Sequence, residues 1–221
     1  MPFNPSDLED THIHKGLRQQ LVRELRAKGI KDEKILAAFM ERPRHFFLEN
    51  TFAEWAYKDV AFPIDADQTI SQPYTVAVQT TLLDLKKGDK VLEIGTGSGF
   101  QACVLAFLGT KVYTIERQKT LFDKTEKLLQ KLGFGHIRTL YGDGYLGAPR
   151  FAPFDKILLT AAAAEIPQDL IDQLKPGGIM VVPYGGGQVQ EMIRITKNED
   201  GSLKKEKFGK YSFVPFLKGK A

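Results

Sequence analysis

The apolar residues of the chain follow a helical period in its first part and a mixture of periods in the rest. Between Leu8 and Ala27 leucines recur every four residues, which predicts an amphipathic helix that ends at Gly29. A second helix is predicted after Asp32, whose side chain can cap it, and it should end at the break before Pro43. The N-terminal part is therefore expected to be helical.

The next segment, "HFFLENTFAEWAYKD" (residues 45–59), is rich in aromatic residues and has no clear period. We expect it to be irregular and to pack against the main domain, because large aromatic side chains contribute strongly to a core. His12, His14 and His45 do not have the spacing of a metal site, so no metal is predicted.

From about Lys86 onwards, short apolar runs rich in β-branched residues alternate with helical segments. The strand-like runs are 90–95, 111–116, 137–141, 155–160 and 178–183, and the helical segments are 100–109, 117–133 and 166–178. The runs are almost continuously apolar, as strands buried on both faces should be, so the fold class is α/β with a doubly wound, mostly parallel sheet. Residues 188–197 and 208–217 flank the turn "NEDGS" and predict a closing hairpin that ends the sheet antiparallel.

Composition restricts the class of protein, its compartment and its partners. The chain has 221 residues, of which 43% are hydrophobic and 26% charged, as in globular domains. No apolar run approaches the ~20 residues of a membrane helix, and the N-terminus lacks the apolar core of a signal peptide. The single cysteine, Cys103, fits a reducing compartment, so a cytoplasmic protein is expected. The net charge of +4 is weak and no basic stripe interleaves with aromatic residues, so no nucleic-acid partner is predicted.

A glycine-rich loop follows the first strand of the alternating part, in "VLEIGTGSGF" (residues 91–100). Gly95, Gly97 and Gly99 allow a tight turn and a close approach of the backbone to a ligand. The third glycine stands one position too early for the dinucleotide fingerprint, which argues against NAD, and the G-K-[ST] of a P-loop is missing.

Two acidic residues follow the second and third strands. Glu116 ends "KVYTIE", where a carboxylate can accept both ribose hydroxyls of an adenosine, a contact that NAD and S-adenosylmethionine would share. Asp143, between Gly142 and Gly144 in "YGDG", can accept from an adenine amino group in a tight turn. Together with the glycine loop they predict an adenosine site at one sheet edge.

Glu93 precedes the glycine loop inside a strand that is expected to be buried. An unpaired charge there is costly, and a nearby cation would offset that cost. S-adenosylmethionine carries an ammonium and a sulfonium group, whereas the pyrophosphate of NAD would be repelled. Glu93 therefore favours S-adenosylmethionine as the cofactor and a methyltransferase as the class of enzyme.

Several further motifs resemble the protein-L-isoaspartate O-methyltransferase family. They are residues 56–85 with the block "QTISQP", the glycine loop, "YGDG", "FDKILLTAAAAEIP", "LKPGGIMVVPYG" and "FVPFL". The resemblance extends from about Arg42 to near the C-terminus, and "QTISQP" narrows it to this family. The chain departs from the family pattern at Asp65-Ala66-Asp67, where Gly-His-Gly is frequent, at Ala163-Ala164, where prolines are frequent, and at Phe216, where leucine is usual.

The resemblance implies a seven-stranded methyltransferase sheet. Residues 1–85 would form an N-terminal helical extension on a Rossmann-like domain of residues 86–221 that binds S-adenosylmethionine, as one compact unit. The implied reaction is methylation of the α-carboxylate of L-isoaspartyl residues in damaged proteins and peptides, by a monomer, with Ser71 at the position of the family's active-site serine. The expected cofactor contacts, including Glu93 from the argument above, are Thr69, Ile70, Ser71, Gln72, Glu93, Gly95, Thr96, Gly97, Gly99, Glu116, Asp143 and Gly144.

Ser71 is expected directly before a helix. Pro73 suits the first helical position, Gln72 is then extended, and the amides of the helix N-terminus attract a carboxylate. A substrate carboxylate, with a pKa of about 4, is ionised at neutral pH and needs no general base, so the Ser71 hydroxyl is predicted to orient it. Two alternatives stay open: a methyltransferase for a small molecule or RNA, and a non-catalytic nucleotide-binding module, against which the joint presence of Glu93, Glu116 and Asp143 argues.

Overall fold

The structure, a computed structural model, describes residues 8–221. The helices are α1 (His12–Ala27), α2 (Glu33–Glu41), α3 (Pro73–Leu82), α4 (Phe100–Phe107), α5 (Lys119–Lys131) and α6 (Gln168–Gln173), with short 3₁₀ helices η2 (Arg44–Phe47), η3 (Asn50–Tyr57), η4 (Gly144–Leu146) and η5 (Pro149–Phe151). The strands are β1 (Phe62–Pro63), β2 (Thr69–Ile70), β3 (Lys90–Ile94), β4 (Lys111–Glu116), β5 (Arg138–Tyr141), β6 (Phe154–Leu159), β7 (Leu174–Tyr184), β8 (Gln190–Lys197) and β9 (Leu203–Tyr211).

Strands β3 to β9 form one seven-stranded sheet in the order β5-β4-β3-β6-β7-β8-β9. The first five strands in this order, β5 to β7, pair parallel with one another, whereas β8 runs antiparallel to both β7 and β9. The doubly wound, mostly parallel sheet with an antiparallel end is thus confirmed. β1 and β2 form a separate antiparallel pair.

The ends of two late strands differ from the sequence prediction. The last strand is "LKKEKFGKY" (β9) and not residues 208–217, so "FVPFL" lies beyond the sheet. β9 is an edge strand, and its exposed lysines suit an edge because charged side chains there oppose pairing with other chains. β7 begins at Leu174, so "LKPGG" belongs to this strand as an irregularity in its pairing with β6, and the preceding helix is only Gln168–Gln173.

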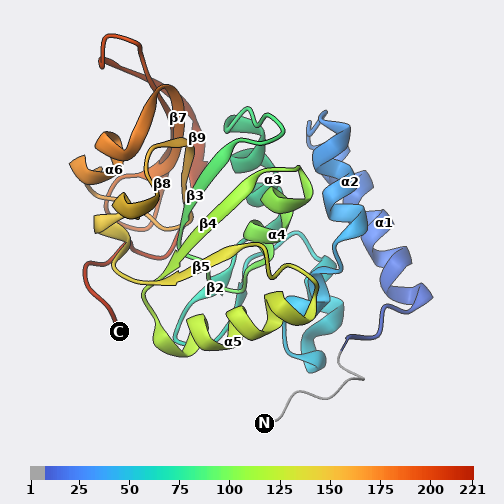
Figure 1. Cartoon of the computed structure of the whole chain (residues 1–221). Helices are drawn as coiled ribbons and strands as arrows, with labels where there is room; N and C mark the ends of the chain where they lie inside the picture. Colours follow the sequence, from blue (N-terminus) through green and yellow to red (C-terminus); the bar gives the residue numbers. More distant parts are fainter. Residues whose placement is uncertain (1–7) are drawn as a thin grey trace.

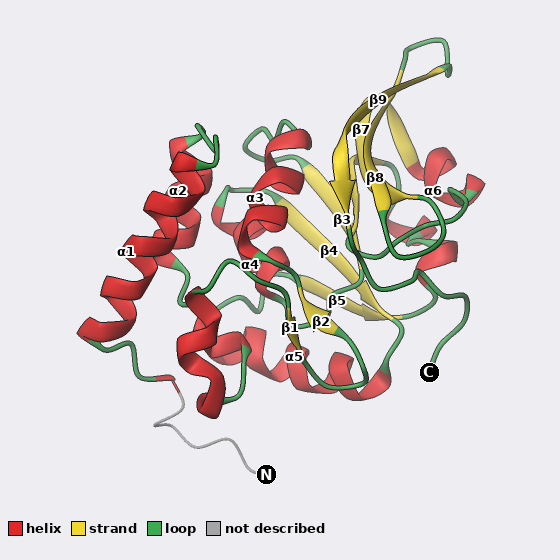
Figure 2. Ribbon diagram, turned by 180° about the vertical axis from the view of Figure 1, so that it is seen from behind, coloured by secondary structure: helices red, strands yellow, loops and turns green. Residues whose placement is uncertain are grey.

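The helices cover the sheet in layers (Figure 1). α3 and α4 lie against one face, and α1 and α2 lie outside them as a further layer, while α6 lies on the opposite face. Figure 2 shows the same arrangement from behind. Of the N-terminal helices, α2 packs on both α3 and α4, and α1 packs on α2 and α3.

The buried residues form one apolar cluster on each face of the sheet. Along β3, Val91 belongs to the cluster beneath α3 and α4, and Leu92 and Ile94 belong to the cluster beneath α6. This alternation follows from the two-residue period of a strand, and it explains why the parallel strands are apolar almost throughout. Glu93, two residues after Val91, shares its face of the sheet by the same alternation and is fully buried there.

The helix boundaries follow from local caps. The side chain of Asp32 accepts hydrogen bonds from the N–H groups of Lys34 and Ile35, so the predicted cap of α2 is confirmed. α1 starts later than predicted, at His12, because Thr11 and His14 form a reciprocal capping box there.

Within residues 8–221 none of the helices is both long and apolar enough to span a membrane.

Candidate active site

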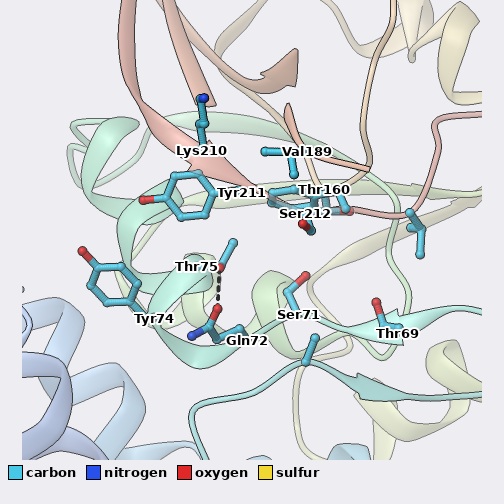
Figure 3. A pocket seen from close by; sticks show the side chains of 13 residues that line it. Thr69, Ser71, Gln72, Tyr74, Thr75, Thr160, Val189, Lys210, Tyr211 and Ser212 are labelled. Carbon is cyan, nitrogen blue, oxygen red and sulfur yellow. Dashed lines mark hydrogen bonds between the residues drawn. The ribbon is translucent and has the colours of Figure 1, made fainter. Parts of the chain in front are cut away.

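A cavity of about 550 Å³ lies between the start of α3, the end of β6 and the segment that follows β9 (Figure 3). The described residues that line it are Ala61, Thr69, Ser71, Gln72, Tyr74, Thr75, Thr160, Val189, Lys210, Tyr211, Ser212, Phe213 and Val214. Its volume falls in the range of small-molecule sites. The rings of Tyr74 and Tyr211 stand at one end, and the hydroxyl of Ser71 points into the space below Ser212.

A second, smaller cavity of about 60 Å³ lies over the glycine loop. Of the residues predicted to contact a cofactor, its lining includes Thr69, Ile70, Ser71, Gly95, Thr96 and Gly97. Four residues line both cavities: Thr69, Ser71, Thr160 and Val214. The two spaces therefore adjoin at the Ser71 loop.

The glycine loop has the open backbone that the sequence predicted. Gly95 has a φ of 96°, and a Cβ built on it would lie 2.4 Å from the Thr160 hydroxyl oxygen. Gly99, with a φ of 88°, is the residue directly before α4. A side chain at either position would collide with a neighbouring threonine and strain the backbone, so the loop needs glycine there to keep its backbone accessible to a ligand.

Glu116 lies at the carboxyl end of β4 and is 4% exposed. Its carboxylate accepts hydrogen bonds from the N–H of Gly97 at 2.9 Å and from the N–H of Gln118 at 2.8 Å. The acid predicted to hold the ribose is thus joined to the glycine loop by a direct bond. Since a carboxylate has about four acceptor positions, it keeps capacity for ligand hydroxyls.

Asp143 is fixed by two backbone groups. Its carboxylate accepts from the N–H of Tyr145 at 2.9 Å and from the N–H of Gly219 at 2.8 Å, which ties the C-terminal segment to this edge. A Cβ on the adjacent Gly144 would lie 2.5 Å from Ile94 and 2.9 Å from the Phe216 ring. The departure at Phe216 therefore places an aromatic ring over Gly144, stacked on Tyr145 at a centroid distance of 4.1 Å.

Glu93 lies behind the glycine loop and outside both cavity linings. It is fully buried and accepts a hydrogen bond from Thr114 Oγ1 at 2.5 Å, and Thr114 Oγ1 is 2.7 Å from Thr96 Oγ1. Burial, with the neighbouring charge of Glu116, raises the pKa of Glu93 to about 8. The structure thus connects Glu93 to the loop through two threonines, and its direct contact with a cofactor cation stays a prediction.

Gly99, Glu116, Asp143 and Gly144 also lie outside the two cavity linings, although Glu116 and Gly99 adjoin the loop that lines the smaller one. The smaller cavity is too small for a nucleoside. A cofactor at the glycine loop therefore needs space beyond this cavity, and the edge that carries Glu116 and Asp143 is the predicted place for it. The two acids and the glycine-rich loop fit a ligand with ribose hydroxyls, and their contacts with such a ligand remain predictions.

The start of α3 agrees with the sequence in part. Pro73 is the first helical residue, and Gln72 before it is extended, as predicted. The prediction that the helix amides are free to bind a substrate carboxylate is wrong at Tyr74, because its N–H donates to Asp59 Oδ1 at 2.7 Å. The chain itself supplies a carboxylate to this helix end, from 15 residues away. No local signal revealed it, because helix caps are sought next to the helix.

Sequence reasoning also missed most of the larger cavity. Thr160 follows β6 and donates to the carbonyls of Ile94 and Gly95, whereas Tyr211 is the last residue of β9 and Ser212 follows it. Among the described lining residues Lys210 is the one with a formal charge. The expectation that a C-terminal hairpin closes the sheet could have directed attention to these positions.

Asp10, His14 and His45 come within ligand distance of one another in the N-terminal extension. Arg18 already donates two hydrogen bonds of 2.9 Å to the Asp10 carboxylate, and so occupies the place of a cation. Both ring nitrogens of His45 have partners, Tyr57 Oη at 2.5 Å and the Glu9 carbonyl at 3.1 Å, and burial lowers its pKa to about 4. This arrangement fits a structural network, and the absence of a metal stays a prediction.

Two departures from the family pattern have visible consequences. Ala66 and Asp67 have φ angles of 58° and 54°, a conformation that favours glycine, and Asp65 pairs with Lys124 at 2.6 Å. Ala163 donates its N–H to the Pro183 carbonyl at 2.9 Å, a bond that a proline could not make.

Comparison with known proteins gives a consistent result. The family model described as protein-L-isoaspartate(D-aspartate) O-methyltransferase matches residues 16–221. A protein-L-isoaspartate O-methyltransferase of Christiangramia forsetii is 53% identical over 96% of this chain and 100% of its own, and one of Dictyoglomus turgidum is 46% identical over 95% and 94%.

Solved structures agree in fold. A protein-L-isoaspartate O-methyltransferase superposes with a TM-score of 0.81 at 29% identity, covering 90% of this chain and 65% of that chain. A Plasmodium falciparum structure of this kind, in complex with S-adenosyl-L-homocysteine, has a TM-score of 0.79 at 23% identity, which bears on the fold alone. Because the family model matches residues 16–221 of the chain and a relative is 53% identical over 96% of it, this chain belongs to the protein-L-isoaspartate(D-aspartate) O-methyltransferase family.

Proposed function

We propose that this protein transfers a methyl group from S-adenosylmethionine to the α-carboxylate of L-isoaspartyl residues in damaged proteins and peptides. The observation that carries the proposal is the shared wall of the two cavities. Thr69, Ser71, Thr160 and Val214 line both the space over the glycine loop and the larger space beside it. A donor bound at the glycine loop and an acceptor bound in the larger cavity would therefore meet at Ser71.

The cofactor would be held by the glycine loop around Gly95 and Gly97, by Thr69 to Gln72, and by the carboxylates of Glu116 and Asp143. When bound, S-adenosylmethionine supplies an electrophilic methyl group. The chain supplies orientation: Glu116 is bonded to the N–H of Gly97, so the ribose acceptor and the loop keep a constant relative position. No side chain is needed to activate the methyl group.

The acceptor carboxylate is itself the nucleophile. At neutral pH it is ionised, because its pKa is about 4, and no proton has to be removed. The Ser71 hydroxyl has no hydrogen-bond partner in the described part of the chain and points into the cavity, so it is free to donate to one carboxylate oxygen. That contact would align the other oxygen with the methyl group, which is a proximity effect.

The product, a methyl ester, is a better acyl donor than the free acid. The next backbone nitrogen of the substrate attacks the ester carbonyl, methanol leaves, and a succinimide forms without help from the protein. Hydrolysis of the succinimide returns part of the material as normal aspartate. Repeated cycles convert isoaspartyl residues to aspartyl residues, which makes the reaction a repair step.

A peptide pair tests the proposal. The protein is incubated with methyl-labelled S-adenosylmethionine and with matched L-isoaspartyl and L-aspartyl peptides, and base-labile methyl ester is counted while the isomers are separated over time. We expect ester from the isoaspartyl peptide alone, followed by aspartyl product. The two carboxylates have similar charge, so their geometry decides, and a misplacement of about 1 Å costs on the order of a hundredfold in rate. Equal labelling of both peptides would refute the repair function.

Ser71→Ala tests the role of the hydroxyl. We expect kcat to fall far more than S-adenosylmethionine affinity, because the interaction that matters most forms with the acceptor in the transition state. Ser202→Ala, in the exposed turn before β9, serves as the matched control and should retain wild-type kcat. Wild-type kcat and KM in Ser71→Ala would reduce Ser71 to a structural residue.

The same proposal includes a monomer in the cytoplasm with no nucleic-acid partner, and a helical extension (1–85) that works as one unit with the domain of residues 86–221. The weak net charge of +4 supports the lack of nucleic acid, and the packing of α2 on α3 and α4 supports a single unit. Size-exclusion chromatography with light scattering tests the monomer.

A further inference from the structure

Asp59 is a buried acid that lies outside both cavity linings, between η3 and β1. Its side chain is 2% exposed. Oδ1 accepts from the N–H of Tyr74 at 2.7 Å, and Oδ2 accepts from Gln72 Nε2 at 3.2 Å and from Lys28 Nζ at 2.5 Å. Gln72 Nε2 also reaches the Asp59 carbonyl at 3.1 Å. Gln72 and Tyr74 are one and three residues after Ser71, so Asp59 fixes the chain on the C-terminal side of that serine.

Arg44, in η2, fixes the same loop from a second direction. Its Nη2 donates to the carbonyl of Ser71 at 2.9 Å, and its guanidinium lies 5.0 Å from the centre of the Phe100 ring. The side chain is almost fully buried, and Nε and Nη1 have no hydrogen-bond partner among residues 8–221. Burial lowers the pKa of Arg44 to about 9, although the charge of Asp59 acts in the opposite direction. A buried cation with one hydrogen bond costs stability, and that bond goes to Ser71.

The two contacts restrict the backbone of Ser71 and leave its side chain free. The carbonyl is bonded to Arg44, and the next helix turn is bonded to Asp59. The hydroxyl therefore changes position mainly by rotation about its own Cα–Cβ bond. Both clamping residues come from the N-terminal extension, and so does Lys28, at the end of α1, which pairs with Asp59.

We propose that Asp59 and Arg44 are positioning residues that hold Ser71 in place for the acceptor carboxylate. The inference rests on the proposed function, in which Ser71 orients that carboxylate. The extension is then part of the catalytic apparatus, because a shift of the loop by about 1 Å is enough to cost on the order of a hundredfold in rate.

A double-mutant cycle tests whether Asp59 acts through Ser71. Asp59→Asn keeps an oxygen for the Tyr74 N–H but turns an amide toward the donors Gln72 and Lys28, so the clamp loosens. We expect kcat for an isoaspartyl peptide to fall about 10- to 100-fold, with S-adenosylmethionine affinity changed less than about threefold. In a Ser71→Ala background the same substitution should lower kcat less than about twofold, because the group it positions is gone. Equal losses in both backgrounds would overturn the proposal.

Arg44 provides a second, independent arm. Arg44→Lys can still donate to the Ser71 carbonyl and should retain kcat within about threefold, whereas Arg44→Met should lose about tenfold or more. Equal kcat in the two variants would count against the clamp. Asp123→Asn, which breaks an exposed ion pair with Lys119 on α5, is the matched control for the loss of one acidic charge and should keep wild-type kcat. If a variant of the double-mutant cycle fails to fold, the two Arg44 variants still test the proposal, and if an Arg44 variant fails to fold, the cycle still does.

The wild-type protein separates failure of the clamp from failure of the function. If it does not methylate the isoaspartyl peptide, the proposed function fails and kinetics cannot be used. Hydrogen exchange then tests the clamp directly: Asp59→Ala removes the acceptor of the Tyr74 N–H and should therefore speed exchange of that amide at least tenfold relative to amides in α5. Unchanged exchange would overturn the clamp.

Discussion

Glu93→Gln should make the protein more stable at pH 8 while leaving its stability at pH 5 nearly unchanged. Glu93 is fully buried, its Oε1 has no partner in the described structure, and burial raises its pKa to about 8 from the ordinary 4.5 of a glutamate. Between these pH values the folded protein keeps a proton that the unfolded chain has released. The folded state therefore binds more protons, and the free energy of unfolding decreases as pH rises through this window.

The magnitude follows from linkage. Each pH unit between 4.5 and 8 removes about 1.4 kcal/mol, so the wild-type protein loses roughly 3–5 kcal/mol across the window from this one group. That is a large part of the roughly 5–15 kcal/mol of a typical domain. Glutamine keeps the shape and an oxygen for the Thr114 hydroxyl, and it has no charge to bury, so the variant should lack this loss.

The assay is urea unfolding at pH 5, 6, 7 and 8, followed by the fluorescence of the single tryptophan, Trp55. Other groups titrate too, so the quantity of interest is the difference in unfolding free energy between Glu93→Gln and the wild type at each pH. This difference should grow steadily in favour of the variant. A difference that stays constant from pH 5 to pH 8 would show that Glu93 is ionised in the folded protein and would refute the reasoning.

The same variant tests whether Glu93 meets the cofactor. A cation beside Glu93 would lower its pKa, so S-adenosylmethionine would bind the wild-type protein more tightly as pH rises from 6 to 8, and Glu93→Gln would lack this trend. If Glu93 acts only through Thr114 and Thr96, the pH dependence of binding should be the same in both proteins. Titration calorimetry at the two pH values distinguishes these results.

Three further outcomes are expected. Glu116→Ala should weaken S-adenosylmethionine binding by ~1–3 kcal/mol in calorimetry, because charged hydrogen-bond partners are left unmade, and unchanged affinity would remove Glu116 from the site. Lys210→Glu should lower kcat/KM about two- to fivefold for isoaspartyl peptides that have an acidic neighbouring residue, and not for those with a basic one, because an exposed charge pair contributes only a small free energy. Lys205→Glu, on the same strand, should show no such selectivity. Ala66→Gly should raise the unfolding free energy by about 0.5–1 kcal/mol, since its φ of 58° strains alanine, and a lower melting temperature would contradict this.

The sheet was predictable because its information is local. A strand buried on both faces must be apolar at nearly every position, so β3, β4 and β6 are visible as short runs, and helices between them require parallel pairing. The C-terminal hairpin was predicted correctly, but its second strand is Leu203–Tyr211 and not residues 208–217. β9 carries lysines that are exposed on an edge strand, and no apolar pattern marks such a strand, whereas the more apolar "FVPFL" after it lies outside the sheet.

The glycine loop and Glu116 were predictable from neighbouring residues, as a turn after a strand and an acid at a strand end, whereas Ser71 was singled out by the resemblance of "QTISQP" to the family. Asp59, Arg44 and Thr160 were not predictable. Their hydrogen-bond partners are far away in the sequence: Asp59 binds Tyr74, 15 residues away, and Arg44 binds Ser71, 27 residues away. Thr160 binds Gly95, 65 residues away. Nor could the sequence tell that Glu93 bonds to Thr114 on the adjacent strand. A turn or a cap depends on consecutive residues, so the sequence alone determines it. The partner of a buried polar group depends on which distant segments the fold brings together, and only the tertiary structure decides which segments those are.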